Sequence, residues 1–182
     1  ATETENATAE LLLKLLPDHD LAVVNDFGHG FMTLKLRELV SDSPTFLALN
    51  TQTNSANLGF NMITRYKSAQ YCCIDQAEVT LAAGMHHASA AECAAQLLHQ
   101  MDAQTFMTTV GREGSILTLN DGMTYESPAF SHDVVDRVGA GDAFFALTAP
   151  WAYKEYAREL LPFIGNAVGA IQVSIVGNKT PV

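Results

Sequence analysis

The sequence predicts an α/β fold in which helices cover both faces of a largely parallel sheet. Short apolar runs of strand length alternate with longer segments of helical periodicity, and turn residues separate them. Chains that alternate strands and helices in this way build parallel sheets that are buried on both faces. The 182 residues contain no internal repeat and no linker rich in Pro, Gly or Ser. We therefore expect a single α/β domain over residues 1–182.

Several residues in the first half of the chain predict where helices begin. Asn6 is the expected cap of the first helix, and the pairs Asp75 with Glu78 and Ser89 with Glu92 have the spacing of a capping box. A continuous apolar run after the first helix is typical of a buried strand. The expected order is a helix at 7–16, a buried strand at 21–24 that breaks at 25–28, a helix near 33–40, strands at 46–49 and 71–74, a short helix, and a helix from 89 to about 101.

The second half begins with strands and ends with helices. Asn120-Asp121-Gly122 is a hairpin turn signal, and Pro162 suits the first turn of a helix. The expected order is a strand at 105–110, a turn at 111–114, strands at 115–119 and 123–126, and helices at 140–151, 154–161 and 162–176.

Composition limits the classes of partner. Twenty acidic residues against ten basic ones give a formal net charge of −10, which disfavours nucleic acid and anionic membrane surfaces as partners. No apolar run is long enough to predict a membrane-spanning helix. The N-terminus is polar and acidic, unlike a signal peptide, and the three cysteines are sparse, as in a reducing compartment. We expect a cytoplasmic protein.

The stretch from Asp136 to Phe144 is the most informative for function. Gly139 and Gly141 directly precede an apolar helix, where unobstructed N–H groups and the positive end of the helix dipole favour an anion. Asp142 lies in the first turn, where a carboxylate could accept a proton from a substrate hydroxyl. These are the parts of phosphoryl transfer to an alcohol. The same pattern also fits a plain first-turn Asp that stabilises the helix.

Two other nucleotide motifs fit poorly. A dinucleotide fingerprint would need a third glycine, but Phe144 occupies that position, and the stretch does not lie in the first βα unit. The P-loop pattern G-x-x-x-x-G-K-[ST] does not occur in the sequence.

Four segments in order resemble the ribokinase-like, or PfkB, carbohydrate kinases. The stretch from Asp136 to Phe144 resembles the C-terminal signature of that family. Thr109 to Gly114 is similar to its T-x-G-x-x-G turn, and Asp75 to Glu78 to its N-x-x-E motif with Asp in place of Asn. The segment 165–170 resembles its final helix. The resemblance implies a ribokinase-like three-layer αβα fold, and it extends over essentially the whole chain.

The resemblance also implies roles for individual residues. Asp142 would be the catalytic base, and Gly139, Ala140 and Gly141 would form the anion hole for the transferred phosphoryl group. The resemblance further implies that the chain binds ATP and also Mg²⁺, which would be held through water. It also implies a K⁺ site, which Asp136 and the backbone near 174–177 would border. The implied cofactor-binding residues are Thr109, Gly111, Gly114, Asp136 and Asn166, and the implied metal residues are Glu78 and Asp75. Asn166 could equally be a polar residue that packs between helices.

The family's first half carries a Gly-Gly-x-x-x-Asn substrate motif and a β-rich lid, and this sequence has no Gly-Gly pair. We therefore expect the N-terminal half and lid to lie outside these residues. Residues 25–30 are similar to the D-Y-G-K-G stretch of heptose-phosphate kinases, with His29 in place of Lys. The implied function is ATP-dependent phosphorylation of a sugar or sugar phosphate, with a homodimer as the possible assembly. The alternative is a catalytically incomplete module for nucleotide binding or assembly.

Overall fold

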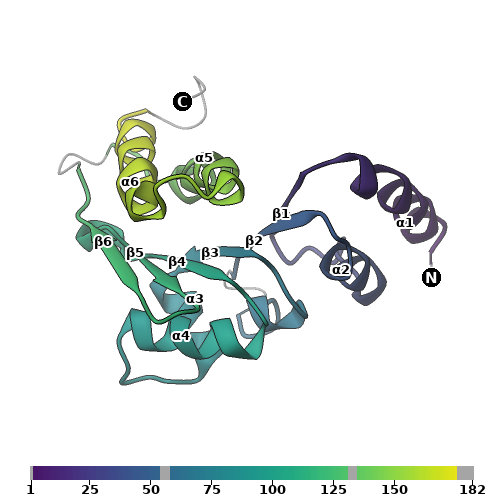
Figure 1. The fold of residues 1–182 in the computed structure, drawn as a ribbon, viewed down its shortest axis with the longest axis horizontal. Helices are drawn as coiled ribbons and strands as arrows, with labels where there is room; N and C mark the ends of the chain where they lie inside the picture. Colours follow the sequence, from purple (N-terminus) through teal and green to yellow (C-terminus); the bar gives the residue numbers. More distant parts are fainter. Residues whose placement is uncertain (1, 54–57, 131–134, 176–182) are drawn as a thin grey trace.

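The computed structural model describes residues 2–53, 58–130 and 135–175, and its centre is a six-stranded sheet (Figure 1). The strands lie across the sheet in their sequence order. The first four are parallel, and the last two are antiparallel to their neighbours. This mostly parallel sheet confirms the predicted class. The strands are β1 (Leu21–Asp26), β2 (Phe46–Thr51), β3 (Tyr71–Asp75), β4 (Thr105–Thr109), β5 (Ser115–Leu119) and β6 (Thr124–Ser127).

Helices cover both faces and complete three layers. Two of them, α5 (Ala140–Lys154) and α6 (Leu161–Gln172), lie over one face, as Figure 1 shows, whereas α3 (Gln76–Ala83) and α4 (Ala90–Gln100) lie over the other. Val40 of α2 (Leu34–Ser41) joins the core under α3 and α4, and α1 (Glu3–Leu15) packs on α2. Each face of the sheet therefore has its own apolar core.

The alternation along β3 separates these two cores. Cys72 and Ile74 belong to the core under α3 and α4, and Tyr71 and Cys73 belong to the core under α5. Because neighbouring side chains in a strand point to opposite faces, the adjacent cysteines cannot bridge each other. Both thiols are free and buried.

The two predicted capping boxes and the predicted hairpin turn are confirmed. Asp75 and Ser89 each form a complete capping box, with Glu78 and Glu92 respectively. The predicted hairpin joins β5 to β6, and Gly122 adopts the left-handed φ of +87° that its turn requires.

Two predicted boundaries and one predicted burial are wrong near the N-terminus. The first helix is capped by Thr2, which accepts the N–H of Glu5, so Asn6 lies inside it. The first strand does not break at Asn25, because the Asn25 and Asp26 backbones pair with β2. That strand is also not fully buried: in the described part of the chain it pairs on one side only, and Val23 is 49% exposed.

The helix predicted at 154–161 does not form. The helix α5 ends at Lys154, Glu155 and Ala157 adopt left-handed φ values of 54° and 43°, and a 3₁₀ turn at Arg158–Leu160 leads into α6. This sharp corner turns the chain back so that α6 packs against α5. The last helix ends at Gln172, short of the predicted 176.

Candidate functional site

The candidate site lies at the carboxyl edge of the parallel strands, where ligands of open α/β sheets bind. The strands β1 to β4 all end at this edge, and the N-terminus of α5 faces it. Gly139 caps α5 with a left-handed φ of +78°, a conformation that favours glycine. The backbone N–H groups of Gly141 and Asp142 donate to no acceptor in the described residues. Free donors at a helix N-terminus favour the binding of an anion.

The Asp142 carboxylate points from α5 toward the sheet. Its Oδ1 accepts two hydrogen bonds, from Asn25 Nδ2 at 3.0 Å and from Gln52 Nε2 at 2.8 Å. Its Oδ2 accepts none from the residues that the structure describes. The side chain also caps no N–H of its own helix, which weighs against the purely helix-stabilising interpretation. The sequence did not predict these two donors, because they lie 117 and 90 residues from Asp142 along the chain.

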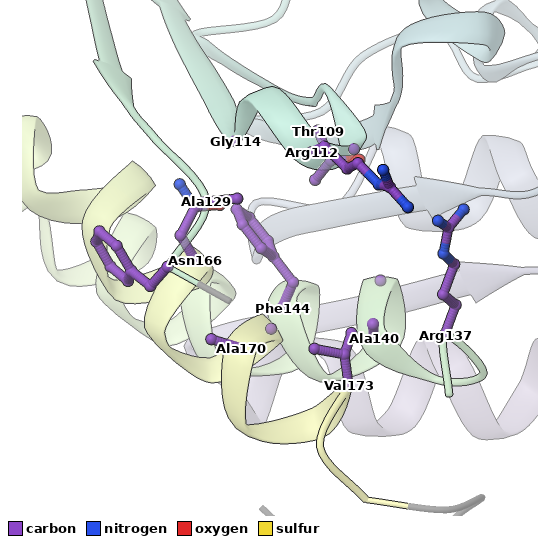
Figure 2. Close-up of a pocket in the computed structure, with 14 residues that line it drawn as sticks. Thr109, Arg112, Gly114, Ala129, Arg137, Ala140, Phe144, Asn166, Ala170 and Val173 are labelled. Carbon is purple, nitrogen blue, oxygen red and sulfur yellow. The ribbon is translucent and has the colours of Figure 1, made fainter. Parts of the chain in front are cut away.

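A cavity of about 230 Å³ opens on the other side of the α5 N-terminus (Figure 2). Its wall is largely apolar, with two arginines at one end and Asn166 toward the other (Figure 2). The lining brings together six of the predicted site residues from three separate segments: Thr109, Gly111, Gly114, Ala140, Gly141 and Asn166. The apolar remainder of the wall includes Ala129, Phe130, Phe144, Ala170 and Val173.

The glycines of the turn after β4 are there for steric reasons. Gly111 and Gly114 adopt positive φ values of 56° and 112°. A Cβ on Gly114 would lie 2.0 Å from the carbonyl oxygen of Ser127, so no larger residue fits. The turn can therefore approach β6 closely and leave the cavity open beside it.

Asn166 is buried in the cavity wall by β6. Its Nδ2 donates to the carbonyl oxygens of Ser127 at 2.7 Å and Pro128 at 3.1 Å. These two bonds fix α6 against the end of β6, a packing role that the sequence left open. Its position in the lining keeps it beside any bound ligand as well.

Two arginines at the polar end of the cavity were not predicted. Figure 2 shows the side chains of Arg112 and Arg137 extending from the β4 turn and from the α5 turn to the same end of the cavity. Neither forms an ion pair with a residue that the structure describes. Unpaired guanidinium groups favour phosphate, which they bind with two parallel hydrogen bonds. The sequence signal was available, since each arginine lies inside a predicted phosphate motif.

Asp75 and Glu78 stand apart from this cavity at the end of β3. Glu78 Oε1 accepts the N–H of Thr53 at 2.6 Å, and Glu78 Oε2 accepts the N–H of Asp75 at 3.2 Å. Burial raises the pKa of Glu78 above its ordinary value. Asp75 Oδ1 accepts the N–H of Glu78 at 2.8 Å, which leaves Asp75 Oδ2 with no donor in the described chain.

Asp136 also lies outside the cavity lining. Its N–H and that of Val135 both donate to the carbonyl oxygen of Val173, at 3.1 and 2.9 Å, and its Oδ1 accepts the N–H of Val138. The expected cation site includes positions 176 and 177, which lie outside the described residues.

The described part of the chain holds neither a clustered metal site nor a membrane-spanning helix. Among residues 2–53, 58–130 and 135–175, no group of three or more His, Cys, Asp or Glu side chains could hold a metal ion. No helix in the same residues is both long and apolar enough to cross a membrane.

Comparison with known proteins gives one family match. The family model described as pfkB family carbohydrate kinase matches residues 60–182. The bifunctional protein HldE of Nitrobacter winogradskyi is 26% identical over 150 residues, which are 81% of this chain and 30% of that protein. A 2-dehydro-3-deoxygalactonokinase of Haloferax volcanii is 41% identical over 51 residues, which are 28% of this chain and 16% of that protein.

Solved structures share the fold at low identity. Phosphofructokinase-2 from Escherichia coli in complex with potassium superposes with a TM-score of 0.79 at 14% identity, covering 96% of this chain and 57% of that one. Ribokinase from Thermotoga maritima gives a TM-score of 0.69 at 19% identity, covering 90% and 53%. The fold is therefore ribokinase-like. The chain spans about a third of the HldE proteins and about half of these solved kinases.

Proposed function

Because this chain belongs to the pfkB family of carbohydrate kinases, we propose that it supplies the nucleotide site and the catalytic base for ATP-dependent phosphorylation of a sugar hydroxyl. One observation carries the proposal. The N-terminus of α5 presents free N–H groups with Gly141 on the cavity side, while the carboxylate of Asp142 faces β1 and β2. A phosphoryl group at this terminus would lie between a nucleotide side and an acceptor side.

Asp142 acts on the acceptor hydroxyl. Its free Oδ2 takes the hydroxyl proton as the oxygen forms a bond to the γ-phosphorus, and the bond from that phosphorus to the bridging oxygen of ADP breaks. The N–H groups of Gly141 and Asp142, with the helix dipole, stabilise the charge on the transferred group. ATP supplies the phosphoryl group as a substrate of the reaction.

The cavity fits a nucleotide in shape and in chemistry. Its apolar wall at Phe144 and Ala170 suits a flat base, and Arg112 and Arg137 at its polar end suit phosphates. The chain has a net charge of −10, which repels the negatively charged phosphates of a nucleotide. Two unpaired arginines at the cavity offset this repulsion locally. We assign nucleotide contacts to the turn of Thr109, Gly111 and Gly114 and to Asn166.

The metal proposal rests on the donor set at the end of β3. Carboxylate oxygens suit Mg²⁺, which keeps several of its waters in proteins. Both Glu78 oxygens already accept N–H groups, so direct ligation would compete with the capping box. Asp75 Oδ2 is free, and we propose that Asp75 and Glu78 hold Mg²⁺ through water. A K⁺ site bordered by Asp136 is proposed from the sequence resemblance and from the potassium complex of the similar phosphofructokinase-2.

For the acceptor we propose a sugar or sugar phosphate. The similarity to HldE proteins and the segment from Asn25 to Gly30 favour a heptose phosphate or another aldose phosphate. The second candidate function is a nucleotide-binding or assembly module, which stays a prediction. The cytoplasmic location and the homodimer stay predictions.

Transfer of radioactive phosphate tests the proposal. The complete gene product would be incubated with Mg²⁺, [γ-³²P]ATP and a panel of acceptors: ribose, fructose 6-phosphate, inosine, 2-dehydro-3-deoxygalactonate and a heptose phosphate. The kinase proposal predicts a labelled product with at least one sugar or sugar phosphate, and none without an acceptor. Nucleotide binding in calorimetry with no transfer to any acceptor would favour the module. Absence of both would contradict each function.

A further inference from the structure

We propose that Asn25 and Gln52 are positioning residues that clamp Oδ1 of Asp142 and thereby reserve Oδ2 for the substrate hydroxyl. The inference rests on the proposed function, because it takes Asp142 as the base. Neither residue belongs to the predicted site, and neither lines the cavity. Each reaches Asp142 from the end of a different strand of the sheet.

The clamp holds the carboxylate without neutralising it. Two amide N–H groups, at 3.0 and 2.8 Å, converge on one oxygen and so fix both the position and the rotation of the carboxylate. A lysine or arginine in the same place would stabilise the negative charge more strongly and weaken the carboxylate as a base. Neutral amides orient the group at a smaller cost in basicity, which suits a proton acceptor.

A buried side chain joins the two arms of the clamp. Asn61, which is 1% exposed, donates through Nδ2 to the carbonyl oxygens of Asp26 at 2.8 Å and Gln52 at 3.2 Å. Arg65 Nη1 donates in turn to Asn61 Oδ1 at 2.8 Å. The backbones next to Asn25 and at Gln52 are therefore tied together, so the two amides are held at a fixed spacing.

The strand end under Asn25 is anchored a second time. The Asp26 carboxylate is buried and accepts the Tyr66 hydroxyl at 2.9 Å and the N–H of Gly28 at 2.9 Å. These contacts hold the end of β1, which stays paired with β2 through Asp26 although the sequence predicted a break at Asn25. Rigid support behind a catalytic group is what precise positioning requires.

The orientation of the Asn25 amide has a cost to stability. Its Oδ1 is buried and accepts no hydrogen bond from any residue that the structure describes. A buried oxygen with no donor is destabilising, because it has lost its hydration without gaining a hydrogen bond. The amide donates its N–H to Asp142 despite that cost, and such violations of polar satisfaction concentrate at functional sites.

Three variants of the complete gene product test the clamp, with the acceptor that is labelled in the transfer assay. Asn25→Ala and Gln52→Met are each expected to lower kcat about 10–100-fold while KM for ATP stays within about threefold, because misplacing a catalytic group slows chemistry more than binding. Gln96→Met is the matched control: its Nε2 donates to Ala83 on the opposite face of the sheet, so its kcat should match wild type. A kcat within twofold of wild type in both clamp variants would overturn the proposal, as would a rise in KM alone. Melting curves identify any variant that fails to fold. Gln52→Glu is then used in place of that variant, because an ionised glutamate has the size of glutamine but can only accept hydrogen bonds.

A double-mutant cycle separates positioning from general structural damage. In an Asp142→Asn background, Asn25→Ala or Gln52→Met should change the residual transfer rate less than about twofold, because residues that act as one unit are not additive. Full additivity would overturn the clamp. Should Asp142→Asn retain wild-type activity, the assignment of the base fails instead, which is a separate result from the effect of the amides.

Discussion

The contact between α6 and α5 at Gly165 offers a test of the packing that shapes the cavity. A Cβ placed on Gly165 would lie 2.2 Å from Cζ of Phe144, the ring that forms part of the cavity wall. One turn further along the same helix, a Cβ on Gly169 would lie 4.0 Å from Cδ2 of the same ring, which is an ordinary contact. Gly165→Ala and Gly169→Ala are therefore a matched pair.

The expected difference follows from two opposing effects. Both substitutions gain about 0.8–1 kcal/mol of helix propensity, which cancels in the comparison. At Gly165 the ring must move by more than 1 Å to reach ordinary contact distance, and overpacking of this kind costs about 1–3 kcal/mol. Gly165→Ala should thus be about 1–3 kcal/mol less stable than Gly169→Ala. For a chain of this length the Tm difference is about 2–12 °C.

Urea unfolding followed by circular dichroism measures this difference, with equal m-values required for the comparison. Wild type should be about 0.8–1 kcal/mol less stable than Gly169→Ala, and at least as stable as Gly165→Ala. Equal stability of the two variants would refute the close approach of α6 to Phe144, and with it the shape of the cavity.

Three other predictions concern charges, thiols and backbone. Arg112→Gln and Arg137→Gln should each weaken Mg-ATP binding in calorimetry about 5–10-fold, as the loss of an exposed charged contact worth about 1 kcal/mol does, whereas equal affinity would refute the phosphate role. The three buried cysteines should react with Ellman's reagent only after unfolding. Burial raises the pKa of Cys73 from 9.0 to about 12, so this thiol's contribution to stability is complete below pH 9 and is lost between pH 9 and 12, which alkaline melts can follow. Gly114→Ala should cost about 1–3 kcal/mol or more, because its Cβ meets backbone, and unchanged unfolding would contradict the turn.

Patterns of residues close together in the sequence predicted most of the secondary structure. The capping boxes at Asp75 and Ser89 and the hairpin at Gly122 depend on residues three or four positions apart, and each forms as predicted. The predicted helix at 154–161 failed because tertiary packing of α6 on α5 requires a corner there. Two left-handed residues, Glu155 and Ala157, make that corner although neither is a glycine.

The site was predictable only where its residues are contiguous. Gly139 to Asp142 can be recognised as a candidate anion site with a neighbouring carboxylate because these residues lie within four positions. The partners of that carboxylate cannot be recognised in this way: Asn25 and Gln52 are brought to Asp142 by the packing of α5 over β1 and β2. A sequence pattern shows which group can act as a base but not which groups hold it.

The proposed function depends most on Asp142 as the group that takes the proton of the acceptor hydroxyl. The most direct test is the rate of ³²P transfer by Asp142→Asn, with Asp20→Asn, an exposed position outside the site, as the matched control. Asp142→Asn should transfer phosphate at less than about 1% of the wild-type rate, since a general base contributes about 10²–10⁴-fold to the rate. Its Kd for Mg-ATP should stay within about threefold, because the carboxylate faces away from the cavity. Transfer by Asp142→Asn within tenfold of wild type would contradict the claim.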